Sequence, residues 1–213
     1  HIFLVTVIFE LTGALLSFLV FVQDYPPLRA AGISLFHSVA AFNNSGFDIL
    51  GNYQNLIPYQ SDILLNLVTC ALIFFGGIGF FVIRELWAKR CRLSVSLILI
   101  VVGTLLLKLT EDVTWLGAFF QSVSARTAGF STYPLGKFSN AGLLVMTVLM
   151  FIGASPGSTG GGIKTSTFFV ILQGIKSAAT NQSERAFHYA IPLGTFRKAV
   201  VITLLSLAVV ILG

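Results

Sequence analysis

Apolar stretches of two different lengths follow one another along the chain, and this alternation restricts the fold more than any other feature. A helix needs about 20 apolar residues to cross the hydrocarbon core of a bilayer. The sequence predicts membrane spans over 2–22, 62–87, 93–107 and 200–213, a longer apolar region over 140–176, and apolar helices too short to cross over 33–42 and 115–125. The order span, short helix, span therefore occurs twice in succession.

The composition agrees with an all-α membrane protein. Hydrophobic residues make up 55% of the chain, charged residues make up 10%, and the mean hydropathy is +0.90, whereas about 25% of the residues in a soluble domain are charged. The alternating polarity of membrane β-strands is absent. The net charge of +5 is explained by basic residues near the ends of spans, which orient a membrane protein, so we predict no nucleic-acid partner.

The two short helices belong to an internal repeat. The segments FHSVAAFNNSGF (36–47) and FQSVSARTAGF (120–130) share an F-x-S-V-x-A pattern and a final Gly-Phe pair, and Gly46 and Gly129 lie 83 positions apart. Matching helices before matching Gly-Phe pairs indicate a duplicated span, re-entrant loop and span, which is typical of repeat architectures.

The distribution of basic residues predicts the orientation in the cell membrane. One side of the predicted spans collects eight of them: Arg84, Lys89, Arg90, Arg92, Lys176, Arg185, Arg197 and Lys198. The side that carries both short helices has four, Arg29, Lys108, Arg126 and Lys137, together with most of the acidic residues. Since lysine and arginine accumulate on the cytoplasmic side, the basic loops are predicted to be cytoplasmic, and the short helices enter the membrane from the extracellular side.

The residues after each short helix suit a cation. A helix that enters from outside directs its negative C-terminal end toward the membrane centre. The residues that follow are Asn44, Ser45 and Gly46 in the first loop and Thr127, Ala128 and Gly129 in the second. Small residues and a glycine free to adopt positive φ allow successive carbonyl oxygens to face one axis, where they can replace the hydration shell of a monovalent cation. The alternative is that the two glycines only cap short buried helices.

The apolar region 140–176 is interrupted by the small-residue run GASPGSTGGGIKTS (153–166). As one helix this region would be about 55 Å long, nearly twice the thickness of the hydrocarbon core. Pro156 and the run Gly160, Gly161 and Gly162 break it near the middle of the membrane. Backbone groups freed there would be costly in lipid, so the loop is expected to face a water-filled cavity.

Three of these segments together carry a family resemblance. HSVAAFNNSGFD, SVSARTAGFST and GASPGSTGGGIKTS resemble the second filter, the third filter and the intramembrane gating loop of the Trk/Ktr/HKT superfamily of potassium transporters. The Arg-Thr-Ala-Gly-Phe form is most similar to the ion-translocating membrane subunit of the Ktr type. With their flanking spans, the three motifs bring nearly the whole chain into the match.

The resemblance implies an architecture and partners that the residues alone do not give. It implies four units of span, pore loop and span around one pore, of which 1–90 is the second, 91–180 is the third, and 181–213 is a cytoplasmic linker with the first span of the fourth. It also implies potassium uptake, a homodimer within membrane lipid, and a cytoplasmic nucleotide-binding ring subunit. The gating role falls on Gly153, Ala154, Ser155, Pro156, Gly157, Ser158, Thr159, Gly160, Gly161, Gly162 and Lys164, with hydroxyl groups of Ser155, Ser158 and Thr159 available to hold the loop closed.

Four residues beside the filters are expected to support them: Phe47, Asp48, Arg126 and Phe130. An exposed cation would repel potassium, so Arg126 is predicted to point behind the filter and to pair with Glu111 or Asp112. Lys164 either sets a barrier or anchors the gate to a carboxylate, or it extends toward the cytoplasmic interface.

Two further polar residues lie on apolar segments. Glu10 is predicted to bond to neighbouring helix ends, although it could instead attract cations. His37 is predicted to be a hydrogen-bonded core residue.

Other functions fit the sequence less well. The phosphate-binding pattern GxxxxGK[ST] fails because Ile163 separates Gly162 from Lys164. No acid pair, nucleophile–base pair or metal-ligand cluster occurs at useful spacing, so we predict that the chain is not an enzyme. A secondary transporter with broken helices at a midplane site and a scaffold of closely packed helices remain as alternatives. Potassium is the expected cargo, and sodium stays open as a coupling or activating ion.

Overall fold

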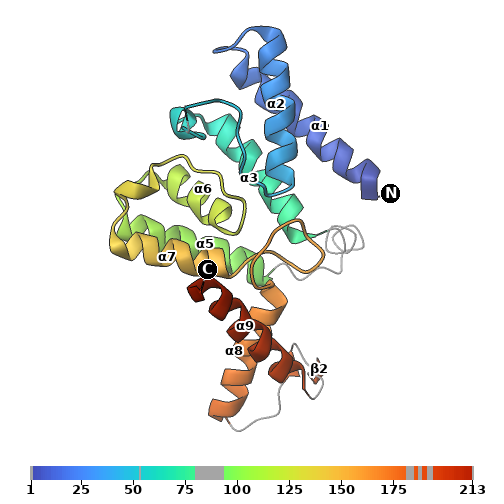
Figure 1. Cartoon of the computed structure of the whole chain (residues 1–213), viewed down its shortest axis with the longest axis vertical. Coiled ribbons are helices and arrows are strands. Elements are labelled where there is room, and N and C mark those ends of the chain that lie inside the picture. The colour runs from blue at the N-terminus through green and yellow to red at the C-terminus, as the bar shows by residue number, and fades with distance from the viewer. Residues whose placement is uncertain are drawn as a thin grey trace.

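In the computed structural model, the described residues are 2–52, 54–79, 94–180, 185–186, 189–190 and 194–212. They are mostly helical (Figure 1). The helices α1 to α3 and α5 to α7 form two groups packed side by side through α3 and α6, and α8 and α9 extend below the second group in the view of Figure 1.

The first group consists of α1 (Ile2–Phe21), α2 (Pro27–Phe42) and α3 (Ile63–Ile78). The helix α1 stops just before Pro26 and Pro27, because proline cannot continue a helix but is well suited to begin the next one. The Asp62 side chain accepts a hydrogen bond of 2.7 Å from Leu65 N and so caps α3. The 3-10 turn η1 (Ile57–Tyr59) lies between α2 and α3.

The second group consists of α5 (Ser94–Thr110), α6 (Trp115–Ala125) and α7 (Asn140–Phe151). Thr114 and Ser139 cap α6 and α7, each by accepting a hydrogen bond of 3.1 Å from a glycine N–H three residues on. The turn η2 (Leu135–Lys137) precedes α7, and the remaining elements are α8 (Thr165–Thr180), β1 (Arg185–Ala186), β2 (Tyr189–Ala190) and α9 (Thr195–Leu212).

The two groups use the same packing device. The Ser38 hydroxyl of α2 donates to the carbonyl oxygen of Glu10 in α1 at 2.6 Å, and the Ser122 hydroxyl of α6 donates to that of Ile100 in α5 at 2.8 Å. A glycine lies one turn after each acceptor, at Gly13 and at Gly103. A β-carbon at either glycine would collide with the same serine oxygen. Because glycine has no side chain, the short helix can approach its span closely in both groups.

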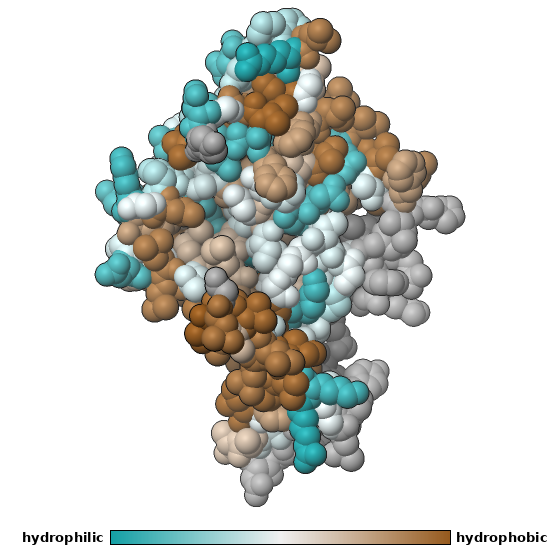
Figure 2. Space-filling model, in the orientation of Figure 1, coloured by the Kyte–Doolittle hydropathy of each residue, from teal (hydrophilic) through white to brown (hydrophobic). Residues whose placement is uncertain are grey.

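Much of the outer surface is apolar, as a bilayer requires. Two of the described helices are long and apolar enough to span a membrane, Phe3–Phe21 with a mean hydropathy of 2.2 and Thr195–Leu212 with 2.0. Large side chains on them are exposed, for example Phe3, Leu15 and Ile211. Figure 2 shows this apolar surface over α9.

The structure changes some of the predicted boundaries. The first short helix begins at Pro27 instead of 33 and has 16 residues, because the Pro-Pro pair starts a helix at once. The third predicted span continues to Thr110. The predicted second span is helical as far as Ile78, and residues 80–93 lie outside the described residues, as do the basic residues Arg84, Lys89, Arg90 and Arg92.

The predicted cytoplasmic linker also differs from the expected all-α fold. It contains the antiparallel pair β1–β2, in which Arg185 pairs with Ala190 and Ala186 pairs with Tyr189.

Candidate functional site

The two predicted filter loops have positive φ at the same two positions. In the first loop φ is +52° at Asn44 and +69° at Gly46, and in the second it is +73° at Thr127 and +84° at Gly129. The residues between them, Ser45 and Ala128, do not share the positive φ. An ordinary strand points successive carbonyls to opposite sides. A change of φ sign at every second residue turns them toward one side instead.

The two loops lie against each other. A β-carbon at Gly46 would lie 2.6 Å from the carbonyl oxygen of Ala128 and 2.8 Å from the Cα of Gly129. Real Cβ atoms do not approach so closely, so the contact requires glycine. The predicted loops, 83 positions apart in the sequence, are therefore neighbours in space.

An asparagine that the sequence analysis missed joins the two loops. Asn55 Oδ1 accepts from Ser131 N at 3.1 Å, and Asn55 Nδ2 lies 3.5 Å from the carbonyl oxygen of Gly46. Leu56 N also donates to the carbonyl oxygen of Ser131 at 3.1 Å. No motif marks Asn55, because its role depends on a partner 76 positions away.

The intervening run 152–164 forms a closed loop between α7 and α8. Its ends pair through a parallel bridge between Ile152 and Ile163. Gly153 N donates to the carbonyl oxygen of Ile163 at 2.9 Å, and Ala154 N donates to that of Gly161 at 3.3 Å. The predicted break in the long apolar region is confirmed, and its base is fastened by backbone hydrogen bonds.

This loop contacts both filter loops at equivalent positions. Asn44 Nδ2 donates to Thr159 Oγ1 at 2.7 Å, and the Thr159 hydroxyl donates to the carbonyl oxygen of Phe42 at 3.1 Å. In the second loop, Thr127 Oγ1 accepts from Gly161 N at 3.0 Å. Asn44 and Thr127 are matching residues of the repeat. The loop 152–164 is thus bonded to the same position of each filter loop.

The loop is also bonded to α3 and to itself. Ser155 N donates to the carbonyl oxygen of Gly77 at 3.0 Å, and the Ser158 hydroxyl donates to that of Ser155 at 2.6 Å. Lys164 Nζ donates to the carbonyl oxygen of Gly160 at 2.6 Å. Lys164 therefore bonds the backbone of its own loop, and it does not bond the carboxylate that the sequence analysis considered as its partner.

Arg126 is buried directly before the second predicted filter loop, but it does not bond the acidic partners predicted for it. Its guanidinium group donates to the carbonyl oxygen of Ser96 at 3.4 Å and to that of Gly153 at 3.3 Å. Glu111 instead accepts from the backbone and the hydroxyl group of Ser139 at the start of α7. The capping serine needs an acceptor at the helix start, where a carboxylate is also favoured by the helix dipole.

The other predicted support residues differ in their surroundings. Phe130 is buried and its ring lies 5.2 Å from that of His37. Asp48 Oδ1 accepts from Leu50 N at 3.1 Å and so fixes the turn after the first filter loop. Phe47 is 69% exposed, so the structure does not place it against the filter loops.

Two polar residues on apolar helices behave as predicted. His37 is buried, and its Nε2 lies 2.8 Å from Thr69 Oγ1. Glu10 Oε1 accepts from Asn43 Nδ2 at 3.0 Å, at the C-terminal end of α2. Both residues are structural partners of the first short helix.

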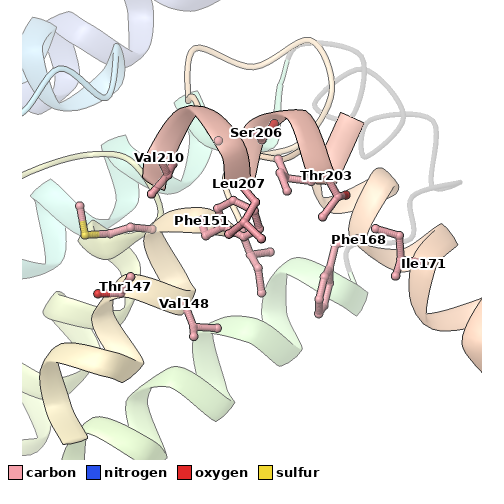
Figure 3. A pocket seen from close by; sticks show the side chains of 13 residues that line it. Thr147, Val148, Phe151, Phe168, Ile171, Thr203, Ser206, Leu207 and Val210 are labelled. Atoms are coloured by element: carbon pink, nitrogen blue, oxygen red, sulfur yellow. The ribbon is translucent and has the colours of Figure 1, made fainter. Parts of the chain in front are cut away.

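An apolar pocket of about 710 Å³ lies beside the base of the loop, between α7, α8 and α9 (Figure 3). Its walls include Val148, Phe151, Phe168, Leu207 and Val210, which point into it from the three helices. Three hydroxyl groups are its only side-chain polar atoms among the lining residues. Such an apolar surface offers few oxygen atoms that could replace the water around an alkali ion.

Comparisons with known proteins identify the family of the chain. The family TrkH, cation transport protein, matches residues 2–96 and 92–213. Ktr system potassium uptake protein B of Bacillus subtilis is 33% identical over 99% of this chain and 52% of its own length. The protein of the same description from Vibrio alginolyticus is 40% identical over 64% of this chain and 35% of its own length.

One further relative and one solved structure are also similar to this chain. Potassium/sodium uptake protein NtpJ of Enterococcus hirae is 34% identical over 78% of this chain and 41% of its own length. The crystal structure of the potassium transporter TrkH from Vibrio parahaemolyticus matches 87% of this chain, over 42% of the length of its own chain. The TM-score is 0.62 at 21% sequence identity, which shows a shared fold. The chain spans about half or less of the length of these relatives. The members of this family are cation transporters and not enzymes, and the chain belongs to this Trk/Ktr family of cation transport proteins.

Proposed function

We propose that this chain supplies two filter loops and the gate of a pore for potassium uptake across the cell membrane. The observation that carries the proposal is the pair of matching loops, each with positive φ at two alternate residues, that meet at Gly46 and Gly129. The family membership adds cation transport, and two relatives named potassium uptake proteins favour potassium. The relative named as a potassium/sodium uptake protein keeps sodium as a second ion of the same site.

The filter would act through main-chain oxygens. Carbonyls of Asn44, Ser45 and Gly46 and of Thr127, Ala128 and Gly129 would replace water around the ion, with the remaining oxygens supplied elsewhere in the assembled transporter. Both glycines have positive φ and lie in a close contact, so a side chain at either position would displace the carbonyls. Ion preference is then a property of backbone geometry.

The loop 153–162 would act as the gate. It is bonded to Asn44 and Thr127 at the inner end of both filter loops, where it would block an ion that leaves the filter. Opening requires these hydrogen bonds to break, at about 1 kcal/mol for each. A small number of weak bonds can hold the loop closed and still release it.

The remaining partners follow from the family resemblance. The proposed assembly is a homodimer in the membrane lipid, with a cytoplasmic nucleotide-binding ring subunit that acts on the gate. The proposed orientation places the filter loops toward the outside and the basic ends of the spans, including Arg197 and Lys198 at the start of α9, toward the cytoplasm.

The test replaces Gly129 by serine in the assembled transporter. Because φ is +84° there, a serine strains the loop, and we expect potassium preference over sodium to fall by about tenfold or more, as one to two lost oxygen contacts would cause. Gly136→Ser is the matched control, since a β-carbon there meets nothing within 4 Å. The measurement is the uptake of potassium and of sodium by each variant when both ions are present. An unchanged preference in Gly129→Ser, or saturable uptake of an organic solute, would contradict the filter.

A further inference from the structure

A small cavity of about 20 Å³ lies where the two filter loops and the gating loop 153–162 come together. Asn44 of the first filter loop, Arg126 of the second and Ala154 of the gating loop all line it. The rest of its wall is mainly apolar and comes from α3, α5 and α6, for example Ile73, Ile100 and Val123. The cavity therefore adjoins each moving or conducting part of the proposed pore.

Two of the residues that line the cavity each have a buried polar atom without a hydrogen-bond partner among the described residues, Asn44 Oδ1 and Arg126 Nε. Each side chain is only 8% exposed. Their other polar atoms are used, since Asn44 Nδ2 bonds Thr159 and the terminal nitrogens of Arg126 bond Ser96 and Gly153. A buried polar atom without a partner costs about 1–3 kcal/mol, and more in a charged group.

The chemistry of the two atoms limits what can lie between them. The carbonyl oxygen of Phe42, 3.4 Å from Asn44 Nδ2, can only accept, so it fixes the amide with Oδ1 as the acceptor on the other side. Arg126 Nε can only donate. The guanidinium charge repels a cation, and the amide oxygen repels an anion. A water molecule suits both atoms, and it needs a cavity of at least about 10–15 Å³.

We propose that one ordered water occupies this cavity, accepts a hydrogen bond from Arg126 Nε and donates one to Asn44 Oδ1. The water links the two filter loops from behind. It also makes Arg126 a positioning residue, because the same side chain holds Gly153 at the start of the gating loop. The water site stands on the cavity and the two atoms alone, whereas its effect on ion preference rests on the proposed function.

The first test is a structure of the full chain in lipid nanodiscs at a resolution that shows ordered water. We expect one peak about 2.7–3.2 Å from both Arg126 Nε and Asn44 Oδ1. An empty cavity overturns the proposal, and so does a side chain that fills it. Crystals grown with rubidium and bromide distinguish a bound ion from a water molecule. An anomalous signal at the peak would show an ion there and would also overturn the proposal.

The second test is Arg126→Lys, which keeps the positive charge and removes Nε. We expect the peak to be lost and potassium preference over sodium to fall about tenfold or more, the effect of losing at least one hydrogen bond of a charged group. Arg29→Lys is the matched control, since Arg29 is exposed and lies over the ring of Tyr25. A peak that persists unchanged in Arg126→Lys overturns the assignment.

The ion measurement separates the two proposals. A lost peak with unchanged ion preference refutes the positioning role of Arg126. A wild-type transporter that carries no potassium refutes the proposed function, while the water peak can still be confirmed in the same protein.

Discussion

The side-chain nitrogen of Asn44 lies 2.7 Å from the hydroxyl oxygen of Thr159, which bonds a filter loop directly to the gating loop. The same hydroxyl group donates to the carbonyl oxygen of Phe42, so Thr159 is held by two groups at the end of the first short helix. The matching residue of the second repeat, Thr127, accepts from Gly161 N. The closed loop is thus held by side chains at one repeated position.

Replacing Thr159 by valine should raise the basal potassium flux. Valine has nearly the same shape but neither donates nor accepts, so both hydrogen bonds are lost, at about 1 kcal/mol each. We expect flux in the absence of an activating partner to rise about tenfold or more. The measurement is potassium efflux from liposomes that contain the assembled transporter.

The control for this prediction is Thr147→Val. The Thr147 hydroxyl bonds only the carbonyl oxygen of Leu143 in its own helix and touches neither filter loop. Its flux should stay at the wild-type level. A Thr159→Val flux equal to that of this control would show that the hydrogen bonds do not hold a gate.

Replacing Thr127 by asparagine should stabilise the protein. Thr127 has φ of +73°, which is unfavourable for a β-branched residue but is accessible to asparagine. The first repeat already has Asn44 at this position. Relief of about 1 kcal/mol of strain should raise the midpoint of thermal unfolding by about 2–4 °C. Thr110→Asn, at the end of α5, should give no such rise, and a lower midpoint for Thr127→Asn would refute the strain.

Deletion of 155–160 should leave the pore unblocked. Ala154 N donates to the carbonyl oxygen of Gly161 at 3.3 Å, so the two residues that the deletion joins already lie close together. The bonds to Asn44 and α3 disappear with the deleted segment. We expect higher basal flux at normal expression, measured with the same liposomes. A loss of flux in a normally expressed protein would contradict the role of the loop as a plug.

Replacing Gly13 by alanine should destabilise the fold without changing ion preference. The added carbon would lie 2.5 Å from Ser38 Oγ and 2.7 Å from Leu72 Cδ1, so α1 has to move away from α2 and α3. Overpacking of this kind costs about 1–3 kcal/mol. Gly32→Ala, in the open on α2, should instead stabilise its helix by up to about 1 kcal/mol. The midpoint of thermal unfolding, followed with a fluorescent reporter that does not react with thiols, measures the stability of both variants. A changed ion preference in Gly13→Ala would show that helix packing in this group also affects the filter.

The parts of this fold that the sequence predicts are those set by neighbouring residues. Apolar length placed α1 and α6 to within one residue, and Pro156 with the triple glycine located the break between α7 and α8. The repeat at Gly46 and Gly129 predicts two matching loops, and both glycines have positive φ in the structure.

The parts that could not be predicted depend on distant partners. Arg126 was assigned a carboxylate, because a buried charge usually pairs with another charge. Three acceptors on α5 and the gating loop satisfy its terminal nitrogens instead. Asn55 carries no local signal, and its contact with Ser131 exists only once the two loops meet. The positive φ of Thr127 is contrary to the preference of its residue type and follows from the repeat.

The bridge between Ile152 and Ile163 has a mechanical consequence. Both ends of the gating loop are fastened to each other, and α8 begins at Thr165, two residues beyond the bridge. In the proposed mechanism, a pull along α8 would act on the two ends together and tilt the loop as one rigid flap, without first stretching it. In the proposed mechanism, a displacement smaller than the width of a single atom would break the hydrogen bonds that hold the flap closed.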